Sequence, residues 1–159
     1  PVEPEDHDSV RALVSEAFGQ QKEADLVEEL RRDGETVLEL IATCEQEPVG
    51  HVLFSRIAVE VDGETWPAVA LAPVAVVPAR QHSLVGTTLI ENAHHMLDEM
   101  GETLSVVLGD PAYYPRFGYE RARAAAFDSD YQCDALMARA QGDAPQRGRL
   151  VYPRAFSAL

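Results

Sequence analysis

The chain has 159 residues, of which 27 are acidic and 13 basic, and its formal net charge at pH 7 is −14. A surface this acidic repels nucleic acid and anionic membranes, so binding to either is not expected. The hydrophobic fraction of 46% is typical of a globular protein, and no apolar run approaches the ~20 residues that cross a bilayer. We therefore expect one cytoplasmic domain spanning residues 1–159.

The acidic composition has two explanations. Lys22 is the only lysine, and an acidic, lysine-poor surface suits a halophile protein, in which salt screens the repulsion between carboxylates. An acidic protein from an ordinary salt environment would have the same composition.

Cys44 and Cys133 lie far apart without a CxxC spacing, so neither a structural disulfide nor a metal site is expected.

The N-terminal part is expected to hold two helices. Asp6 or Asp8 can cap the first, which ends near Gly19. Its apolar positions follow helical spacing: Val10, Leu13, Val14 and Ala17. A second, acidic helix is expected over residues 23–32.

A meander of strands should follow. The pattern predicts strands over residues 36–43 and 49–61, separated by a turn at 45–48. Asp62-Gly63 is a hairpin-turn pair, and the central strand after it spans residues 68–77, stopped by Pro78.

The second half alternates helix and strand. Residues 83–100 have an apolar face at helical spacing, with Gly101 as a stop. Residues 103–108 are apolar without polar alternation, as in a strand covered on both faces. The helix between two apolar strands predicts a right-handed crossover, so 68–77 and 103–109 should be parallel neighbours.

The remaining pattern is weaker. A short helix is expected over 112–117, a strand near Tyr119, a loop with a short helix around 135–140, and a last strand at 150–152. Together the elements predict an α/β or α+β sandwich built on a mixed sheet.

Two stretches carry the candidate chemistry. Residues 72–86 are a strand, a tight loop and a helix start, which present backbone N–H groups to a phosphate, and Arg80 adds positive charge. An ordinary strand-to-helix connection is the alternative. Residues 107–119 are a buried strand that breaks at Gly-Asp-Pro and delivers Tyr113 and Tyr114. A phenol beside a phosphate loop suggests acid catalysis on a cofactor-bound substrate; aromatic packing is the alternative.

From Gly109 to Tyr119 the chain reads Gly-Asp-Pro-Ala-Tyr-Tyr-Pro-Arg-Phe-Gly-Tyr. Here it resembles the GNAT superfamily of acyl-CoA-dependent N-acetyltransferases, in the subgroup with a Gly-Asp-Pro-x-Tyr-Tyr-x-Arg-Phe-Gly-aromatic signature. The likeness runs from residues 4–8 to 151–156. It implies a mixed, mostly antiparallel central sheet with flanking helices and a splayed central pair of parallel strands. In the family's Gln/Arg-x-x-Gly-x-Gly loop, Leu84 stands where the first glycine belongs.

The resemblance implies transfer of an acetyl group from acetyl-CoA to an amine, by direct attack of the amine on the thioester and without a metal. Tyr114 matches the tyrosine that acts as general acid towards the CoA sulfur. The expected cofactor contacts are the backbone of Val74, Ala75 and Val76 at the pantetheine arm, Arg80, Gln81, Ser83, Val85, Gly86 and Thr87 at the pyrophosphate, and Asp110 and Tyr113 near the arm. Asp110 can equally cap the short helix, and Tyr113 can pack against the core.

Several alternatives stay open. His51 is a candidate base or a packed strand histidine, and Trp66 covers a sheet edge or borders the acceptor cleft. If Leu84 already lies in the first helical turn, its dihedrals are ordinary and its side chain can turn towards the core. The function is either an N-acetyltransferase for a small-molecule or peptide amine, or a non-catalytic GNAT-fold regulatory or interaction module with a degenerate CoA loop. The oligomeric state, monomer or homodimer, is open.

Overall fold

The computed structural model describes residues 1–158 and places them in two compact units. The first unit contains Pro1–Ser55, Ala72–Met96 and the C-terminal residues from Pro153; the second contains Arg56–Leu71 and Leu97–Tyr152. Strands β2 (Glu47–Val61) and β3 (Glu64–Val76) each contribute residues to both units.

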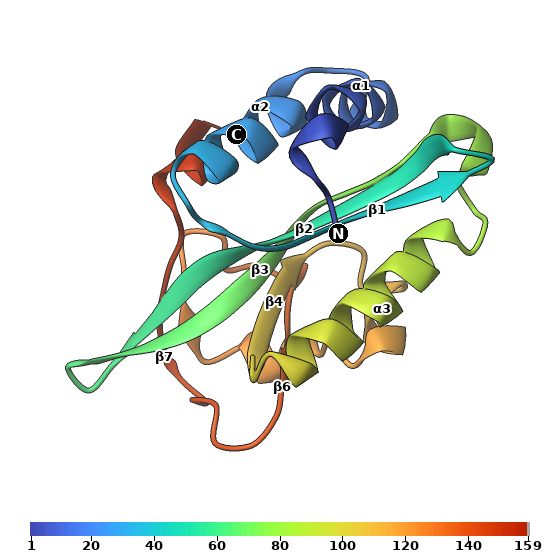
Figure 1. Cartoon of the computed structure of the whole chain (residues 1–159). Coiled ribbons are helices and arrows are strands. Elements are labelled where there is room, and N and C mark those ends of the chain that lie inside the picture. The colour runs from blue at the N-terminus through green and yellow to red at the C-terminus, as the bar shows by residue number, and fades with distance from the viewer. Residues whose placement is uncertain (159) are drawn as a thin grey trace. The chain divides into compact units, whose positions relative to one another are not determined.

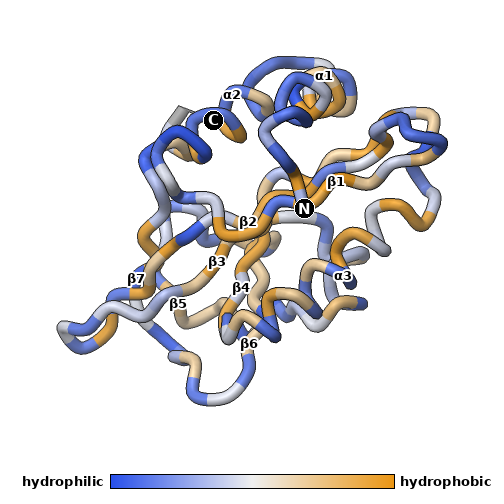
Figure 2. Tube along the Cα trace, viewed as in Figure 1, coloured by the Kyte–Doolittle hydropathy of each residue, from blue (hydrophilic) through white to orange (hydrophobic). Residues whose placement is uncertain are grey.

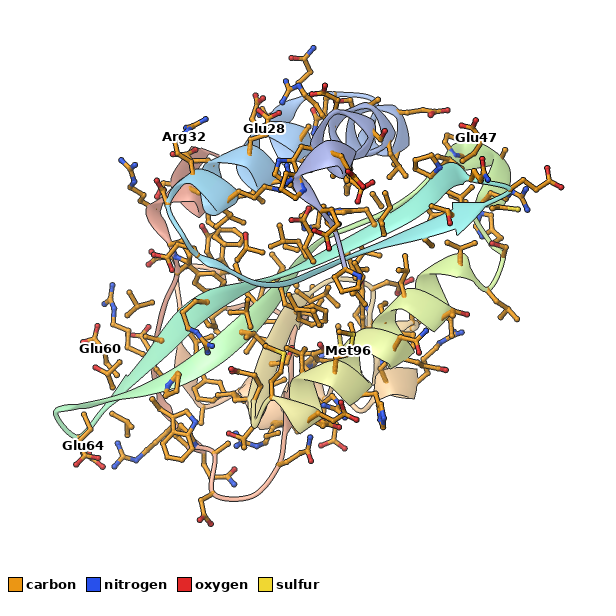
Figure 3. The ribbon with its side chains drawn as sticks, viewed as in Figure 1. Glu28, Arg32, Glu47, Glu60, Glu64 and Met96 are labelled. Atoms are coloured by element: carbon orange, nitrogen blue, oxygen red, sulfur yellow. The ribbon has the colours of Figure 1, made fainter. Side chains whose placement is uncertain are left out.

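Two helices lie side by side in the first unit (Figure 1), as the sequence predicted: α1 (His7–Phe18) and α2 (Lys22–Arg32). A short helix, η1 (Pro4–Asp6), leads into α1. Arg11 of α1 pairs with Asp25 of α2 at 2.9 Å. Glu28, labelled with Arg32 in Figure 3, pairs with Arg11 at 3.0 Å. The buried residues of α2 are apolar: Ala24, Leu26, Val27 and Leu30.

The first unit also contains an antiparallel strand pair. Strand β1 (Thr36–Cys44) pairs with β2 from Thr36↔Ser55 to Cys44↔Glu47. Glu45 and Gln46 form the turn with φ of 52° and 69°, the left-handed dihedrals of a two-residue hairpin. Figure 2 shows hydrophobic stretches along β1 and β2, while α1 and α2 mix hydrophobic and hydrophilic residues. Helix α3 (Val85–Glu99) belongs to this unit up to Met96.

The second unit is built on strands in the order β5-β7-β2-β3-β4-β6. The strands not yet placed are β4 (Leu104–Leu108), β5 (Phe127–Asp128), β6 (Leu136–Ala140) and β7 (Gly148–Val151). Strand β3 pairs with β4 in parallel, from Val69↔Ser105 to Leu71↔Val107, which confirms the predicted parallel neighbours. Glu60 and Glu64 flank the turn between β2 and β3 (Figure 3), where Asp62 and Gly63 have φ of 51° and 77°.

One hydrophobic cluster forms the core of the second unit. Its members are Ile57, Val59, Ala68, Ala70, Leu104, Val106, Ala124, Phe127, Leu136, Ala138, Ala144 and Leu150. Trp66 packs against this cluster. The lack of polar alternation along β4 is thereby explained, because Leu104 to Val107 are all buried.

The predicted helix around residues 135–140 is wrong: those residues include strand β6. This strand pairs antiparallel with β4, from Leu104↔Ala140 to Leu108↔Leu136. Leucine, methionine, alanine and arginine favour helices in isolation, but the ladder with β4 and the burial of Leu136, Met137 and Ala138 decide for a strand.

Smaller differences surround the tyrosines. The expected helix over 112–117 is a single 3-10 turn, η3 (Tyr114–Phe117). The expected strand near Tyr119 is only an isolated bridge, Glu120↔Ala138, before a short helix α4 (Arg121–Ala124). The chain's last element is a 3-10 helix, η4 (Arg154–Ala158).

Over residues 1–158, no helix is both long enough and apolar enough to cross a membrane. Over the same residues, no three His, Cys, Asp or Glu side chains are grouped so that they could hold a metal ion.

Candidate active site

The predicted site residues are divided between the units. Residues 74–87 lie in the first unit and residues 110–114 in the second. The β3–β4 ladder ends at Leu71, whereas β3 continues to Val76. The backbone groups of Val74, Ala75 and Val76 therefore lie outside that ladder.

The loop after β3 is held by its own hydrogen bonds. It begins with a 3-10 turn, η2 (Pro78–Arg80). The amide of Gln81 donates from Nε2 to the carbonyl of Val76 at 3.0 Å. The hydroxyl and the backbone N–H of Ser83 both donate to the carbonyl of Arg80. His82 has a φ of 66°, in the left-handed region that favours glycine.

Leu84 lies just before α3, which begins at Val85, and it has no left-handed φ. Its side chain does not turn towards the core. The side chain is 75% exposed. Leu84 shares its side of the helix start with the exposed Thr88 and Asn92, whereas Leu89 and Ala93 are buried. The 3.6-residue period of α3 therefore directs Leu84 away from the buried face.

A groove of about 660 Å³ lies between β1 and α3. Leu84 and three of the expected cofactor residues, Arg80, Ser83 and Val85, border it. Met96, labelled in Figure 3, also borders the groove, on α3. Arg80 donates from Nη2 to the sulfur of Cys44 at 3.3 Å. Its guanidinium thus lies on the groove side of the loop.

The start of α3 packs tightly against β2 at Gly50. A β-carbon on Gly50 would lie 2.6 Å from Cγ1 of Val85 and 2.9 Å from Cδ1 of Leu89. Both distances are shorter than ordinary carbon contacts of about 3.5–4.0 Å. The missing side chain of Gly50 therefore sets how closely the helix start approaches the strand.

The helix start suits an anion. The first intrahelical bond runs from the N–H of Thr88 to the carbonyl of Leu84 at 2.9 Å, and the amides before it have no acceptor within the helix. The first turn of α3 contains no acidic residue, although the whole chain has a net charge of −14. The N–H of Val85 meets the hydroxyl of Ser83 at 3.4 Å. The N–H groups of the first turn, the helix dipole and a nearby arginine form a chemically fitting place for a pyrophosphate.

In the second unit, Asp110 organises the turn that carries the tyrosines. Its Oδ1 accepts the N–H of Ala112 at 2.8 Å, and its carbonyl accepts those of Tyr113 and Tyr114 at 3.0 and 3.2 Å. The expectation that Asp110 caps the short helix is therefore corrected: its carboxylate closes the preceding turn, and the N-cap of η3 is Tyr113. Asx turns of this kind are common for aspartate because its short side chain reaches the backbone two residues on.

Tyr114 lies within an aromatic cluster. Its ring centroid is 5.1 Å from that of Tyr113, 6.0 Å from Tyr119 and 6.4 Å from Phe117. Burial, with smaller contributions from Tyr113 and Asp110, raises the pKa of Tyr114 to about 12. The phenol therefore keeps its proton at neutral pH and can act as a donor.

Tyr119 is an anchor that the sequence analysis missed. It is fully buried, and its hydroxyl lies 2.7 Å from the hydroxyl of Ser105 on β4. The signal was present, because an aromatic residue closes the signature. Tyr113 has a charged neighbour instead: the guanidinium carbon of Arg116 lies 4.5 Å from the centre of the Tyr113 ring.

His51 is a packed histidine of the first unit. Its side chain is 0% exposed, and Nε2 lies 2.7 Å from Oε2 of Glu39. Arg31 donates from Nε to the other oxygen of Glu39 at 3.0 Å. Such burial excludes direct contact with an acceptor in solution and favours the structural alternative for His51.

The profile of the acetyltransferase (GNAT) domain matches residues 1–122. The chain belongs to the GNAT acetyltransferase family. Among curated relatives, it is 39% identical to the uncharacterised N-acetyltransferase YjhQ of Escherichia coli K12 over 117 residues, which are 72% of this chain and 65% of YjhQ. The match thus spans slightly less than two thirds of that GNAT relative. Over 120 residues the chain is 38% identical to the uncharacterised N-acetyltransferase YhbS of the same strain, covering 75% and 71% of the two chains.

Two solved GNAT structures resemble almost the whole chain. YhbS from Escherichia coli, in complex with CoA, has a TM-score of 0.88 and 31% identity, covering 98% of this chain and 89% of that one. A GNAT acetyltransferase from Brucella melitensis, in complex with acetyl-CoA, has a TM-score of 0.82 and 30% identity, covering 98% and 94%. The expected GNAT fold, a mostly antiparallel mixed sheet with a parallel pair and flanking helices, is confirmed.

Proposed function

We propose that this chain transfers an acetyl group from acetyl-CoA to the amine of a small molecule or peptide. The observation that carries the proposal is the match of 98% of the chain to two GNAT structures that hold CoA and acetyl-CoA. The anion-suited start of α3 supports it from within the chain. No metal is proposed to take part.

In the proposed binding mode, the loop and helix start hold the pyrophosphate. The N–H groups of Gly86 and Thr87 and the side chain of Gln81 would donate to its oxygens, as the matching family positions do. The N–H of Val77 donates to the carbonyl of Val49 on β2, and successive N–H groups of a strand point to opposite edges. The N–H groups of Val74 and Val76, which lie outside the β3–β4 ladder, would therefore donate to the pantetheine arm and the thioester carbonyl. Each well-placed donor to a developing oxyanion contributes about 3–4 kcal/mol.

Tyr114 is the proposed general acid towards the departing thiolate. A thiol has an ordinary pKa of about 8.5, below the value of about 12 for Tyr114. Proton transfer therefore needs a site in which burial raises the pKa of the thiol as well. The acceptor amine attacks in its neutral form, so turnover should rise with pH until that amine is deprotonated.

Binding of acetyl-CoA is the first test. A ligand that binds only the folded chain stabilises it by about 2.7 kcal/mol at a hundred times its Kd, which a thermal shift detects. Release of free CoA thiol with a panel of amines then measures turnover. A chain with neither a shift nor turnover would instead be the non-catalytic module, for which His82 and the exposed Leu84 in the loop are the supporting features.

The role of Tyr114 is tested by Tyr114→Phe. We expect kcat to fall about 10²-fold or more, with the Kd of acetyl-CoA unchanged, because only the proton donor is lost. Tyr131→Phe is the matched control, since Tyr131 contacts Tyr152 in the second unit and has no proposed role in catalysis. Equal turnover by the two variants would show that Tyr114 only packs.

A further inference from the structure

Gly109 and the ring of Tyr114 share one space in the second unit. Gly109 is the first residue after β4. A β-carbon placed on it would overlap Cε2 of Tyr114 and would lie 2.9 Å from Cδ2 and 3.3 Å from Cζ. Carbon atoms in contact are normally about 3.5–4.0 Å apart. The phenol ring therefore rests directly on the backbone of Gly109.

The need for glycine at this position comes from the ring and not from the backbone. Gly118, nine positions on in the same signature, has a φ of 95°, which a residue with a side chain rarely adopts. Gly109 has no left-handed φ. An alanine could adopt its backbone conformation, so the volume that Tyr114 occupies is what excludes a side chain.

Neither partner can easily move aside. The N–H of Gly109 donates to the carbonyl of Ala135 at 3.1 Å, which holds the backbone in place. The ring of Tyr114 packs beside Phe117 and Tyr119, which are 8% and 0% exposed. The bond between the hydroxyls of Tyr119 and Ser105 fixes this aromatic wall to β4. Tyr114 itself is only partly buried, so a displaced ring can turn towards solvent.

We propose that Gly109 is a positioning residue for the proton-donating hydroxyl: its missing side chain sets where the phenol of Tyr114 lies. The inference rests on the proposed function, in which Tyr114 is the general acid. A side chain at position 109 turns the ring outward and moves the hydroxyl away from the leaving group. A misplacement of about 1 Å can lower the rate of a positioned reaction about 10²-fold.

The test is a double-mutant cycle with Gly109→Ala and Tyr114→Phe. Gly109→Ala alone should lower kcat about 10-fold or more, with the Kd of acetyl-CoA changed less than about 3-fold. In the Tyr114→Phe background, the same substitution should change kcat less than about 2-fold, because the hydroxyl is already gone. Phenylalanine keeps the ring, so the loss of stability should be equal in both backgrounds. Equal losses of kcat in both backgrounds would overturn the inference.

A titration gives a readout that does not depend on activity. The ultraviolet absorbance of phenolate, minus the curve of the matching Tyr114→Phe protein, isolates the pKa of Tyr114. Gly109→Ala should lower this pKa from about 12 towards the ordinary value of about 10, because the ring moves into water. An unchanged pKa would refute the displacement. A fully active Tyr114→Phe variant with a shifted pKa in Gly109→Ala would instead refute the general acid and keep Gly109 as the support of the ring.

A double variant that lacks the ring of Tyr114 is the control for a failure to fold. If Gly109→Ala does not fold, Gly109→Ala combined with Tyr114→Ala should fold, because the added methyl group then meets no ring. Failure of that double variant, with Tyr114→Ala alone folded, would show that position 109 excludes a side chain for another reason and would overturn the inference.

Discussion

The loop before α3 concentrates its backbone strain on one residue, His82. A left-handed residue with a β-carbon costs about 1–2 kcal/mol, and His82 has a φ of 66°. Leu84 has no left-handed φ, so its β-carbon imposes no such strain. The two neighbouring positions should therefore respond to glycine in opposite directions.

We expect His82→Gly to raise the free energy of unfolding by up to about 1 kcal/mol, because glycine accepts the left-handed φ. Leu84→Gly should lower the free energy of unfolding by up to about 1 kcal/mol. Glycine makes the unfolded chain more flexible, and at this position it relieves no backbone strain in the folded chain. Urea unfolding of the two variants measures both signs. Shifts in the same direction would contradict the assignment of strain to His82.

The ionisation of Glu39 makes the stability of the first unit depend on pH in the acid range. Burial favours the neutral form and is the largest influence, but hydrogen bonds from His51 and Arg31 outweigh it in sum, so the pKa of Glu39 lies below its ordinary value. In the unfolded chain this pKa is about 4.3. The stabilisation is therefore complete above that pH and is lost as pH falls through the lower, folded value.

Glu39→Gln should remove this part of the pH dependence and destabilise the chain at neutral pH, where Arg31 loses its charged partner. Urea midpoints at pH 7 and in the acid range measure both effects. Glu91→Gln, on the exposed face of α3, is the control and should leave the dependence unchanged. If the stability of Glu39→Gln falls with decreasing pH as steeply as that of the unchanged chain, other carboxylates cause the pH dependence.

At the scale of elements, the close approach of α3 to β2 depends on Gly50. Gly50→Ala should push against Val85 and Leu89 and destabilise the chain by about 1–3 kcal/mol, as overpacking does. The KM for acetyl-CoA should rise as well, because the proposed phosphate site moves with the helix start. Val85→Ala in the same chain removes Cγ1 and should restore part of both losses, with Val85→Ala alone as control. No recovery would mean that the clash lies elsewhere.

At the scale of the whole molecule, the net charge of −14 governs the response to salt. Repulsion among the excess carboxylates destabilises the folded chain, and salt shortens the range of that repulsion to about 3 Å at 1 M. Salt also screens the ion pairs between exposed side chains, such as Arg147–Asp62 at 2.9 Å. This costs little stability, because such pairs contribute little.

We therefore expect Tm to rise between low salt and 1 M salt at pH 7. The rise should shrink near the sequence pI of about 4.6, where the net charge vanishes. Thermal unfolding at the two pH values measures the difference. A Tm that falls with salt at pH 7 would show that attractive surface pairs outweigh the repulsion.

By itself, the sequence determined the features that depend on residues a few positions apart. These include helices α1 and α2 and the Asp62-Gly63 turn, because helical spacing, end signals and turn residues are local. The parallel pair of β3 and β4 followed instead from the general handedness of a strand–helix–strand crossover. The signature from Gly109 to Tyr119 determined the family in the same way. The order of the residues is enough for such inferences.

Only the tertiary structure decided features that depend on partners far along the chain. Strand β6 consists of residues that favour helices, but it pairs with β4 in a ladder. The outward direction of Leu84 depends on which side of α3 is covered. The contact between Gly109 and Tyr114 depends on an aromatic wall anchored at Ser105. Burial and strand pairing outweigh local propensity at these positions, because contacts between distant residues stabilise a conformation that local preferences do not favour.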